Sequence, residues 1–136
     1  MNAAERRQGR ELALQVLFQR EFHSLLSSEE IFHLIEQKVE KIVSAWAQEL
    51  IDGVLGNLEP LDRAIQSVSQ KWKISRMSLV DRNILRLALF EMKFSPTPSK
   101  PEIAINEAVE IAKKYGSTDS GAFVNGLLDQ LARLGN

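Results

Sequence analysis

The chain has 136 residues and a net charge of −1, with 17 basic and 18 acidic side chains. A protein with this balance cannot bind nucleic acid through its overall charge, so any such site must be a local patch. There is no cysteine, which excludes disulfides, thiol catalysis and zinc bound by cysteine. No apolar run approaches the ~18 residues of a membrane span, and no signal-peptide core follows the basic N-terminus. We therefore expect a folded cytoplasmic protein.

The first predicted helix spans residues 3–23 and carries a basic cluster near its start. Arg6, Arg7 and Arg10 lie within about one turn of each other. Cations near a helix N-terminus oppose the helix dipole, so helix stability does not require them there. Two interpretations are open: a solvated, frayed first turn, or a patch that binds phosphate through guanidinium donors.

Four further helices are predicted before the proline-rich connector at residues 95–101, over about 28–40, 42–55, 57–68 and 79–94. The helix at 79–94 is apolar around most of its circumference, which is typical of a central helix in a bundle. Arg82 and Arg86 on this helix are interpreted as partly buried, paired structural charges. We find no chemistry in residues 24–70.

Residues 101–134 predict a hairpin of two amphipathic helices joined by a short polar turn. Gly116 follows the first helix, where a residue free to become left-handed is favoured. Asp119 can cap the second helix, or its carboxylate can accept a bond from a base amine. Phe123 is either the first core residue of the last helix or a ring that stacks on a base.

Sequence motifs for catalysis are missing. His23 and His33 are the only histidines and fall on different predicted helices. There is no glycine-rich phosphate loop, nucleophile elbow or HExxH pattern. We expect no enzymatic activity, no cofactor and no metal site.

Two parts of the sequence carry a family signature. The second half contains Trp72, Arg76-Met77, Asp81-Arg82, Leu85-Arg86, Phe90-Glu91, Ala104-Ile105-Asn106-Glu107-Ala108, Ala112-Lys113, Gly116 and Phe123-Val124-Asn125-Gly126 with Leu128-Asp129; the first helix adds Arg6, Arg7, Arg10, Glu11 and Leu17. Over residues 3–22 and 72–132 the chain resembles the NusB family. Two departures stand out: Phe18 replaces a frequent tyrosine, and Gly9 interrupts the basic run.

The resemblance implies an all-helical fold of two small bundles packed together, with about six or seven helices. It implies one RNA-binding domain over residues 1–136, with helical subdomains at about 1–57 and 58–136. It also implies a transcription antitermination factor that binds single-stranded boxA RNA of ribosomal RNA operon transcripts together with NusE, a small-subunit ribosomal protein. In that complex RNA polymerase reads through terminators.

By position, the resemblance places two surfaces on this chain. The RNA surface maps onto Arg6, Arg7, Arg10, Asp119 and Phe123. The protein-partner surface maps near Phe18, Phe22, Arg76 and Asp81. For Phe123 we favour stacking on RNA over a core role.

Three alternatives accompany this interpretation. The first is a helical scaffold that binds only proteins. The second is the RNA-binding appendage of an RNA cytosine methyltransferase, for which 136 residues leave no room for a cofactor-binding α/β domain. The third concerns the free protein, which would form a homodimer if apolar residues such as Phe22 stay exposed.

Overall fold

A computed structural model describes residues 1–23, 25–35 and 39–134, and these residues form seven α-helices and no strand. The helices are α1 (Ala3–Arg20), α2 (Ser28–Ile35), α3 (Lys41–Gly56), α4 (Leu58–Val68), α5 (Leu79–Leu89), α6 (Pro101–Tyr115) and α7 (Ser120–Arg133). A 3-10 turn, η1 (Ile74–Arg76), precedes α5, and a π-helical segment, η2 (Phe90–Phe94), continues it. The predicted all-helical fold is confirmed. In the described part of the chain, no helix combines the length and apolarity needed to cross a membrane.

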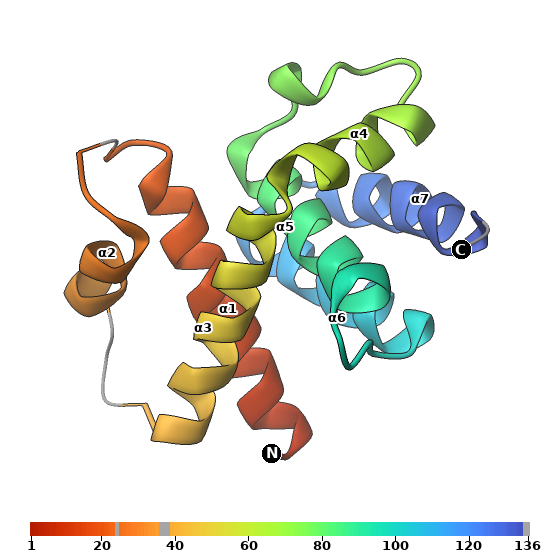
Figure 1. The fold of residues 1–136 in the computed structure, drawn as a ribbon. Helices are drawn as coiled ribbons and strands as arrows, with labels where there is room; N and C mark the ends of the chain where they lie inside the picture. The colour runs from red at the N-terminus through yellow and green to blue at the C-terminus, as the bar shows by residue number, and fades with distance from the viewer. Residues whose placement is uncertain (24, 36–38, 135–136) are drawn as a thin grey trace.

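The helices form two groups that meet at α5 (Figure 1). In one group α1 packs along α3 and contacts α2, and in the other α6 packs along α7. Helix α5 contacts α1, α3, α4, α6 and α7. The most apolar predicted helix is therefore central, as expected. One hydrophobic cluster includes fully buried side chains from both groups, such as Val16, Leu50, Leu85 and Leu128. A boundary between subdomains near residue 57 stays a prediction.

The start of α1 is fixed by a capping box. The Asn2 side chain accepts a hydrogen bond from the backbone N–H of Glu5 at 2.8 Å, and the Glu5 carboxylate accepts one from the Asn2 N–H at 2.9 Å. This exchange satisfies donors that the first turn otherwise leaves free. The turn that carries the basic cluster is therefore a capped helical turn rather than a frayed one.

Several helix ends differ from the prediction. Helix α1 ends at Arg20 rather than at residue 23. The predicted helix 79–94 becomes π-helical at Phe90, whose carbonyl accepts a bond from the Ser95 N–H five residues on. Helix α2 ends at Ile35, and its expected extension to residue 40 passes through residues 36–38, which lie outside the described residues.

Gly116 caps α6 in a different way from the one predicted. Its φ is −94° and its ψ is −167°, so it is extended and not left-handed. A Cβ at this position would overlap the side chain of Ser120 and lie 2.8 Å from the carbonyl oxygen of Ala112. Glycine is required here because Ser120 approaches closely, not because of a positive φ.

Candidate nucleic-acid interface

The three arginines at the start of α1 lie in three different environments. Arg6 is half-buried, and its guanidinium carbon lies 5.1 Å from the centre of the Trp46 ring. Among the described residues the Arg6 guanidinium has no hydrogen bond and no ion pair, so none of its five N–H donors has a protein partner.

Arg7 is partly engaged by a carboxylate of α6. Its Nε and Nη2 donate to the two oxygens of Glu107 at 2.9 and 2.7 Å, and about half of its side chain stays exposed. The hydrogen bond from Arg7 lowers the pKa of Glu107, and the same bond raises the pKa of Arg7. Arg7 therefore stays charged, with only part of its guanidinium free to bind a further anion.

Arg10 does not belong to the surface patch, and the prediction that it does is wrong. Its side chain is 6% exposed, and its Nε and Nη2 donate to the two oxygens of Glu91 at 2.8 and 2.5 Å. Arg10 lies four and seven residues before Leu14 and Leu17, so it falls on the buried stripe of α1. That spacing was the signal for burial, and the shared residue type with Arg6 and Arg7 hid it.

Basic side chains continue from α1 onto the end of α6. A surface cavity of about 300 Å³ is lined by Arg7, Glu11, Glu110, Ile111, Lys113 and Lys114. Lys114 donates to Glu11 at 2.9 Å, and this bond raises the pKa of Lys114. A Cβ built at Gly121 would lie 3.3 Å from Cγ of Lys113. Lys113 therefore connects the arginine end of α1 with the first turn of α7.

The tip of the α6–α7 hairpin leaves a carboxylate exposed. Asp119 occupies the N-cap position of α7, but its side chain makes no capping bond. The capping alternative for Asp119 is wrong, because no N–H of the first turn of α7 donates to its side chain. The neighbouring Ser120 Oγ accepts a bond from the Ser117 N–H at 2.9 Å, which closes the turn before α7 and does not cap the helix. In the described part of the chain, the Asp119 carboxylate has no partner and is available as an acceptor.

Phe123 shares a groove with Trp72. Phe123 is half-buried and packs against the hydrophobic cluster, so part of its ring is a core contact. It also lines a groove of about 450 Å³ with Trp72, which is 58% exposed. Gln70, Lys71 and Gln130 add polar groups to the same groove. Aromatic faces beside polar and cationic groups suit the stacking of an unpaired base.

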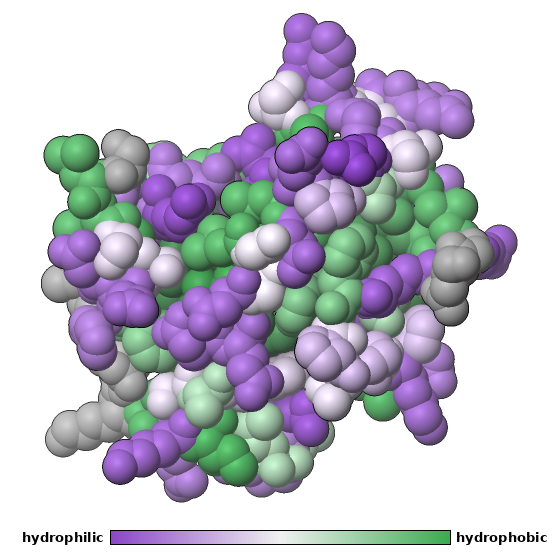
Figure 2. Space-filling model, in the orientation of Figure 1, coloured by the Kyte–Doolittle hydropathy of each residue, from purple (hydrophilic) through white to green (hydrophobic). Residues whose placement is uncertain are grey.

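Apolar side chains are exposed at the end of α1 and beyond it. Phe22 is 60% exposed, and its ring lies edge-on to that of Phe18 at 5.1 Å between centres. Phe18 lines a cavity of about 240 Å³ with Leu14, Gln15, Gln19, Val80 and Tyr115. Figure 2 shows hydrophobic residues gathered in patches between hydrophilic ones on one face of the molecule. Exposed aromatic groups of this kind suit a protein contact.

Arg76 ends η1 and Asp81 lies in the first turn of α5, next to a paired network. Arg76 is exposed and has no partner among the described residues. Asp81 is half-buried, and its Oδ1 is buried without a hydrogen-bond partner. The exposed side chain of Arg76 is therefore accessible for a contact with another protein, whereas Asp81 is only partly accessible.

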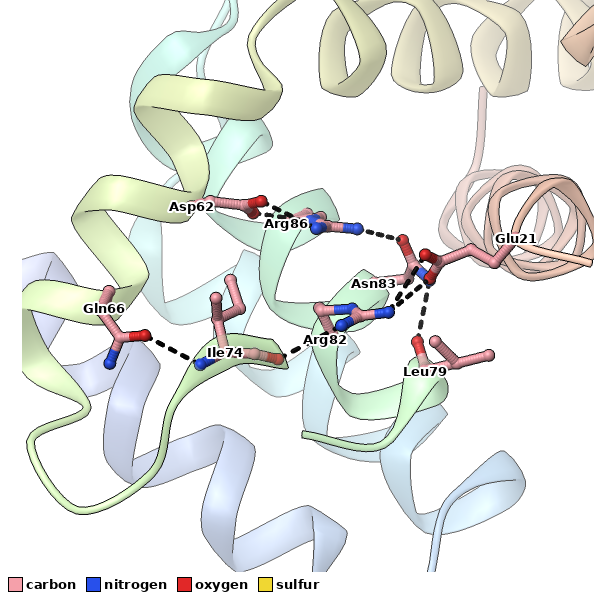
Figure 3. Close-up of polar contacts among 8 residues, drawn as sticks. All are labelled: Glu21, Asp62, Gln66, Ile74, Leu79, Arg82, Asn83 and Arg86. Atoms are coloured by element: carbon pink, nitrogen blue, oxygen red, sulfur yellow. Dashed lines mark hydrogen bonds and ion pairs between the residues drawn. The ribbon is translucent and has the colours of Figure 1, made fainter. Parts of the chain in front are cut away.

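The charges on the following turns are structural, as predicted (Figure 3). Arg86 donates to both oxygens of Asp62 at 2.7 and 2.8 Å, and Arg82 donates to Glu21 at 3.1 Å. The amide of Asn83 also donates to Glu21, at 2.9 Å. These bonds join α4, α5 and the end of α1, so they hold the helix groups together.

The family is decided by a match along almost the whole chain. The model of the NusB family matches residues 7–133. The chain belongs to the NusB family. The transcription antitermination protein NusB of Bdellovibrio bacteriovorus is 53% identical over 133 residues, with 98% of each chain covered. That of Geotalea daltonii is 43% identical over 138 residues, with 95% of this chain and 94% of the relative covered.

Solved NusB structures share the fold. T. maritima NusB is 40% identical with a TM-score of 0.87, covering 94% of this chain and 90% of the other. A structure of the antitermination factors NusB and NusE in complex with dsRNA contains a chain 27% identical to this one, with a TM-score of 0.85 and coverage of 97% and 98%. NusB proteins are transcription antitermination factors and not enzymes. Across the described residues, no group of three or more His, Cys, Asp or Glu side chains is arranged to hold a metal ion.

The sequence does not single out three residues that lie at or next to the candidate RNA surface: Trp72, Lys113 and Trp46. Trp72 belongs to the family signature. Its place in a polar connector between helices also indicates that its ring is exposed. Lys113 lies in the last turn of α6, where the helix dipole alone accounts for a cation, so the sequence does not single it out. Trp46 lies within residues 24–70, where the sequence indicates no chemistry, and no sequence pattern indicates that its ring faces Arg6.

Proposed function

We propose that this chain binds single-stranded boxA-type RNA of ribosomal RNA operon transcripts together with NusE, and so promotes read-through by RNA polymerase in the cytoplasm. The observation that carries this proposal is the surface from Arg6 and Arg7 through Lys113 to the start of α7. On this surface the guanidinium of Arg6 and the carboxylate of Asp119 have no hydrogen-bond or ion-pair partner in the described chain.

Each group on this surface has a role that suits an unpaired strand. Arg6 and the free edge of Arg7 bind phosphates, because guanidinium presents planar donors to an anion. Asp119 accepts a bond from an exocyclic amine on a base edge. Phe123 and Trp72 stack on bases, which only a single strand exposes. Arg10 has no direct part, because its donors are used within the core.

The proposed partner surface consists of Phe18, Phe22, Arg76 and Asp81. With a net charge of −1 and two available arginines, the protein alone binds RNA weakly. NusE strengthens binding because two joined RNA-binding surfaces act on one strand at high effective concentration. A known NusB–NusE complex with dsRNA supports joint binding of RNA by the two proteins. Because that RNA is double-stranded, single-stranded and double-stranded boxA RNA are compared directly in the test below.

A gel-shift titration tests the proposal. The protein is titrated against a short single-stranded boxA-type RNA, a scrambled single strand and the boxA duplex, each with and without NusE. We expect the boxA single strand to bind best, and NusE to tighten its binding.

Three results would contradict parts of the proposal. Binding to NusE without any RNA binding would favour the protein-only scaffold. Equal or better binding of the duplex would contradict single-strand recognition. Full RNA affinity without NusE would contradict the requirement for a partner.

A further inference from the structure

The Trp46 side chain lies close to two arginines of α1. It projects from α3 and is only 8% exposed. Its ring centre is 5.1 Å from the guanidinium carbon of Arg6 and 6.0 Å from that of Arg10. Both distances are within the ~6 Å over which an aromatic face attracts a cation.

Gly9 allows this close approach. A Cβ at Gly9 would overlap Cδ1 of Trp46 and lie 3.2 Å from its Nε1. The indole N–H is buried and has no hydrogen-bond partner. The ring is therefore placed by packing against the backbone of α1, and its face, not its N–H, contacts Arg6. Gly9, which interrupts the basic run, thus makes room for the Trp46 ring beside Arg6.

The two available arginines are held by different means. Glu107 holds Arg7 by taking two of its donors and offsetting its charge. Trp46 contacts the guanidinium of Arg6 without a hydrogen bond, so its donors stay free. A guanidinium that is ordered before binding loses less conformational entropy when it contacts an anion.

We propose that Trp46 is a positioning residue that orients the Arg6 guanidinium for contact with an RNA phosphate. This inference rests on the proposed function, because it assumes that Arg6 binds RNA. It adds a residue that does not itself touch RNA.

A double-mutant cycle tests the inference. Trp46→Leu keeps an apolar side chain but removes the aromatic face, and Trp46→Phe keeps a smaller aromatic face and also removes the unpaired indole N–H. We expect Trp46→Leu to weaken binding of the boxA single strand about two- to five-fold, the range that an exposed cation–π contact supplies. Trp46→Phe should restore most of that affinity. In an Arg6→Ala background, Trp46→Leu should cause no further loss.

Circular dichroism and urea unfolding of each variant ensure that folded protein is compared. A second measurement needs no variant: by NMR, the side-chain protons of Arg6 should be shifted upfield by the indole ring relative to those of Arg63, whose side chain is 72% exposed. Shifts typical of a free arginine would overturn the inference.

The outcomes separate the inference from the proposed function. If Trp46→Leu weakens binding equally with and without Arg6, the positioning role is overturned while RNA binding stands. If the wild type binds no RNA, or Arg6→Ala has no effect, Arg6 is not an RNA contact and the positioning role falls with it.

Discussion

Arg10 and Glu91 form a buried bidentate ion pair that joins α1 to the π-helical segment η2. Their side chains are 6% and 3% exposed. The hydroxyl of Ser99 donates to Glu91 at 2.6 Å, and Nη1 of Arg10 lies 3.6 Å from an oxygen of Glu107. The charge of Arg10 is therefore offset inside the protein, and the residue links α1 to η2.

Removing one member of this pair should strongly destabilise the fold. Arg10→Ala leaves Glu91 buried without its cation, and breaking a buried pair in this way typically costs about 3–5 kcal/mol. Urea denaturation measures the change. Arg6→Ala is the matched control and should cost less than about 1 kcal/mol, because its guanidinium has a cation–π contact but no hydrogen bond or ion pair within the described chain. An Arg10→Ala protein of normal stability that no longer binds RNA would contradict the structural role.

The salt dependence of RNA binding should separate the exposed arginines from the buried one. Arg6→Ala and Arg7→Ala should each reduce the magnitude of the log–log salt slope by about 0.7, the value for one phosphate contact on a single strand. Arg63→Ala removes an exposed arginine of α4 and should leave the slope unchanged. The slope is measured by titration between low and moderate salt. An unchanged slope in an Arg6→Ala, Arg7→Ala double variant would remove this patch from the site.

The helices and their central member could be predicted from hydrophobic spacing, because burial of one face repeats every three or four residues. The partners of buried charges could not. Arg10 and Glu91 are separated by 81 positions, and Arg7 and Glu107 by 100, so no local pattern links them. Only the tertiary packing shows which of the three arginines is buried in an ion pair.

The local sequence also does not reveal the environment of residues whose role depends on a close tertiary contact. Gly116 fits the pattern of a left-handed cap, yet it is extended and accommodates Ser120. Phe123 fits both a core stripe and an exposed ring, and the structure places it half-buried in a groove with Trp72. The local sequence is the same in either case, so the distinction depends on what the rest of the chain brings beside it.

Glu107 should limit RNA affinity while it stabilises the fold. Glu107→Gln removes a negative charge and frees donors of Arg7, so we expect RNA binding at low salt to tighten about two- to five-fold. Glu110→Gln is the comparison, because it makes the same charge change on α6 but Glu110 pairs weakly with Lys113, at 3.8 Å, and not with Arg7. Equal effects of the two variants would show a general charge effect rather than release of Arg7.

The same residue should contribute to acid sensitivity. The hydrogen bond from Arg7 lowers the pKa of Glu107 in the folded protein. The contribution of Glu107 to stability is therefore fully present above pH 4.5, the ordinary pKa of a glutamate. It is lost as the pH falls through the lowered pKa of Glu107 in the folded protein. Unfolding monitored between pH 7 and pH 3 should show a smaller loss of stability for Glu107→Gln than for wild type. A parallel loss in both proteins would contradict the linkage.

Phe22 should be an anchor for NusE. Phe22→Ala removes an aromatic side chain that is 60% exposed and whose ring packs edge-on against Phe18, so stability should change little. A central aromatic anchor typically contributes more than about 1 kcal/mol, so NusE affinity should fall at least about five-fold in calorimetric titration. RNA affinity without NusE should stay normal. If the variant instead abolishes a concentration-dependent dimer in sedimentation and binds NusE normally, the exposed ring belongs to a homodimer surface.

Phe123 should matter more for RNA binding than for stability. The ring is half-buried, and the neighbouring positions Val124, Leu128 and Leu131 of α7 are fully buried without it. A fully buried Phe→Ala change typically costs 3–5 kcal/mol. Loss of a stacking ring costs roughly 1–3 kcal/mol of RNA affinity per base. We therefore expect Phe123→Ala to weaken RNA binding while urea unfolding shifts by less than about 2 kcal/mol, below the core-truncation range.

Two comparisons make the Phe123 result decisive. Phe123→Leu keeps apolar packing but removes the ring, so it should retain stability and still lose RNA affinity. Leu127→Ala truncates a buried neighbour in the same groove and should cost about 2–5 kcal/mol of stability. If Phe123→Ala is as unstable as Leu127→Ala yet binds RNA normally once folded, Phe123 is a core residue. Normal RNA binding by a stable Phe123→Leu protein would lead to the same conclusion, because stacking needs an aromatic face that leucine does not have.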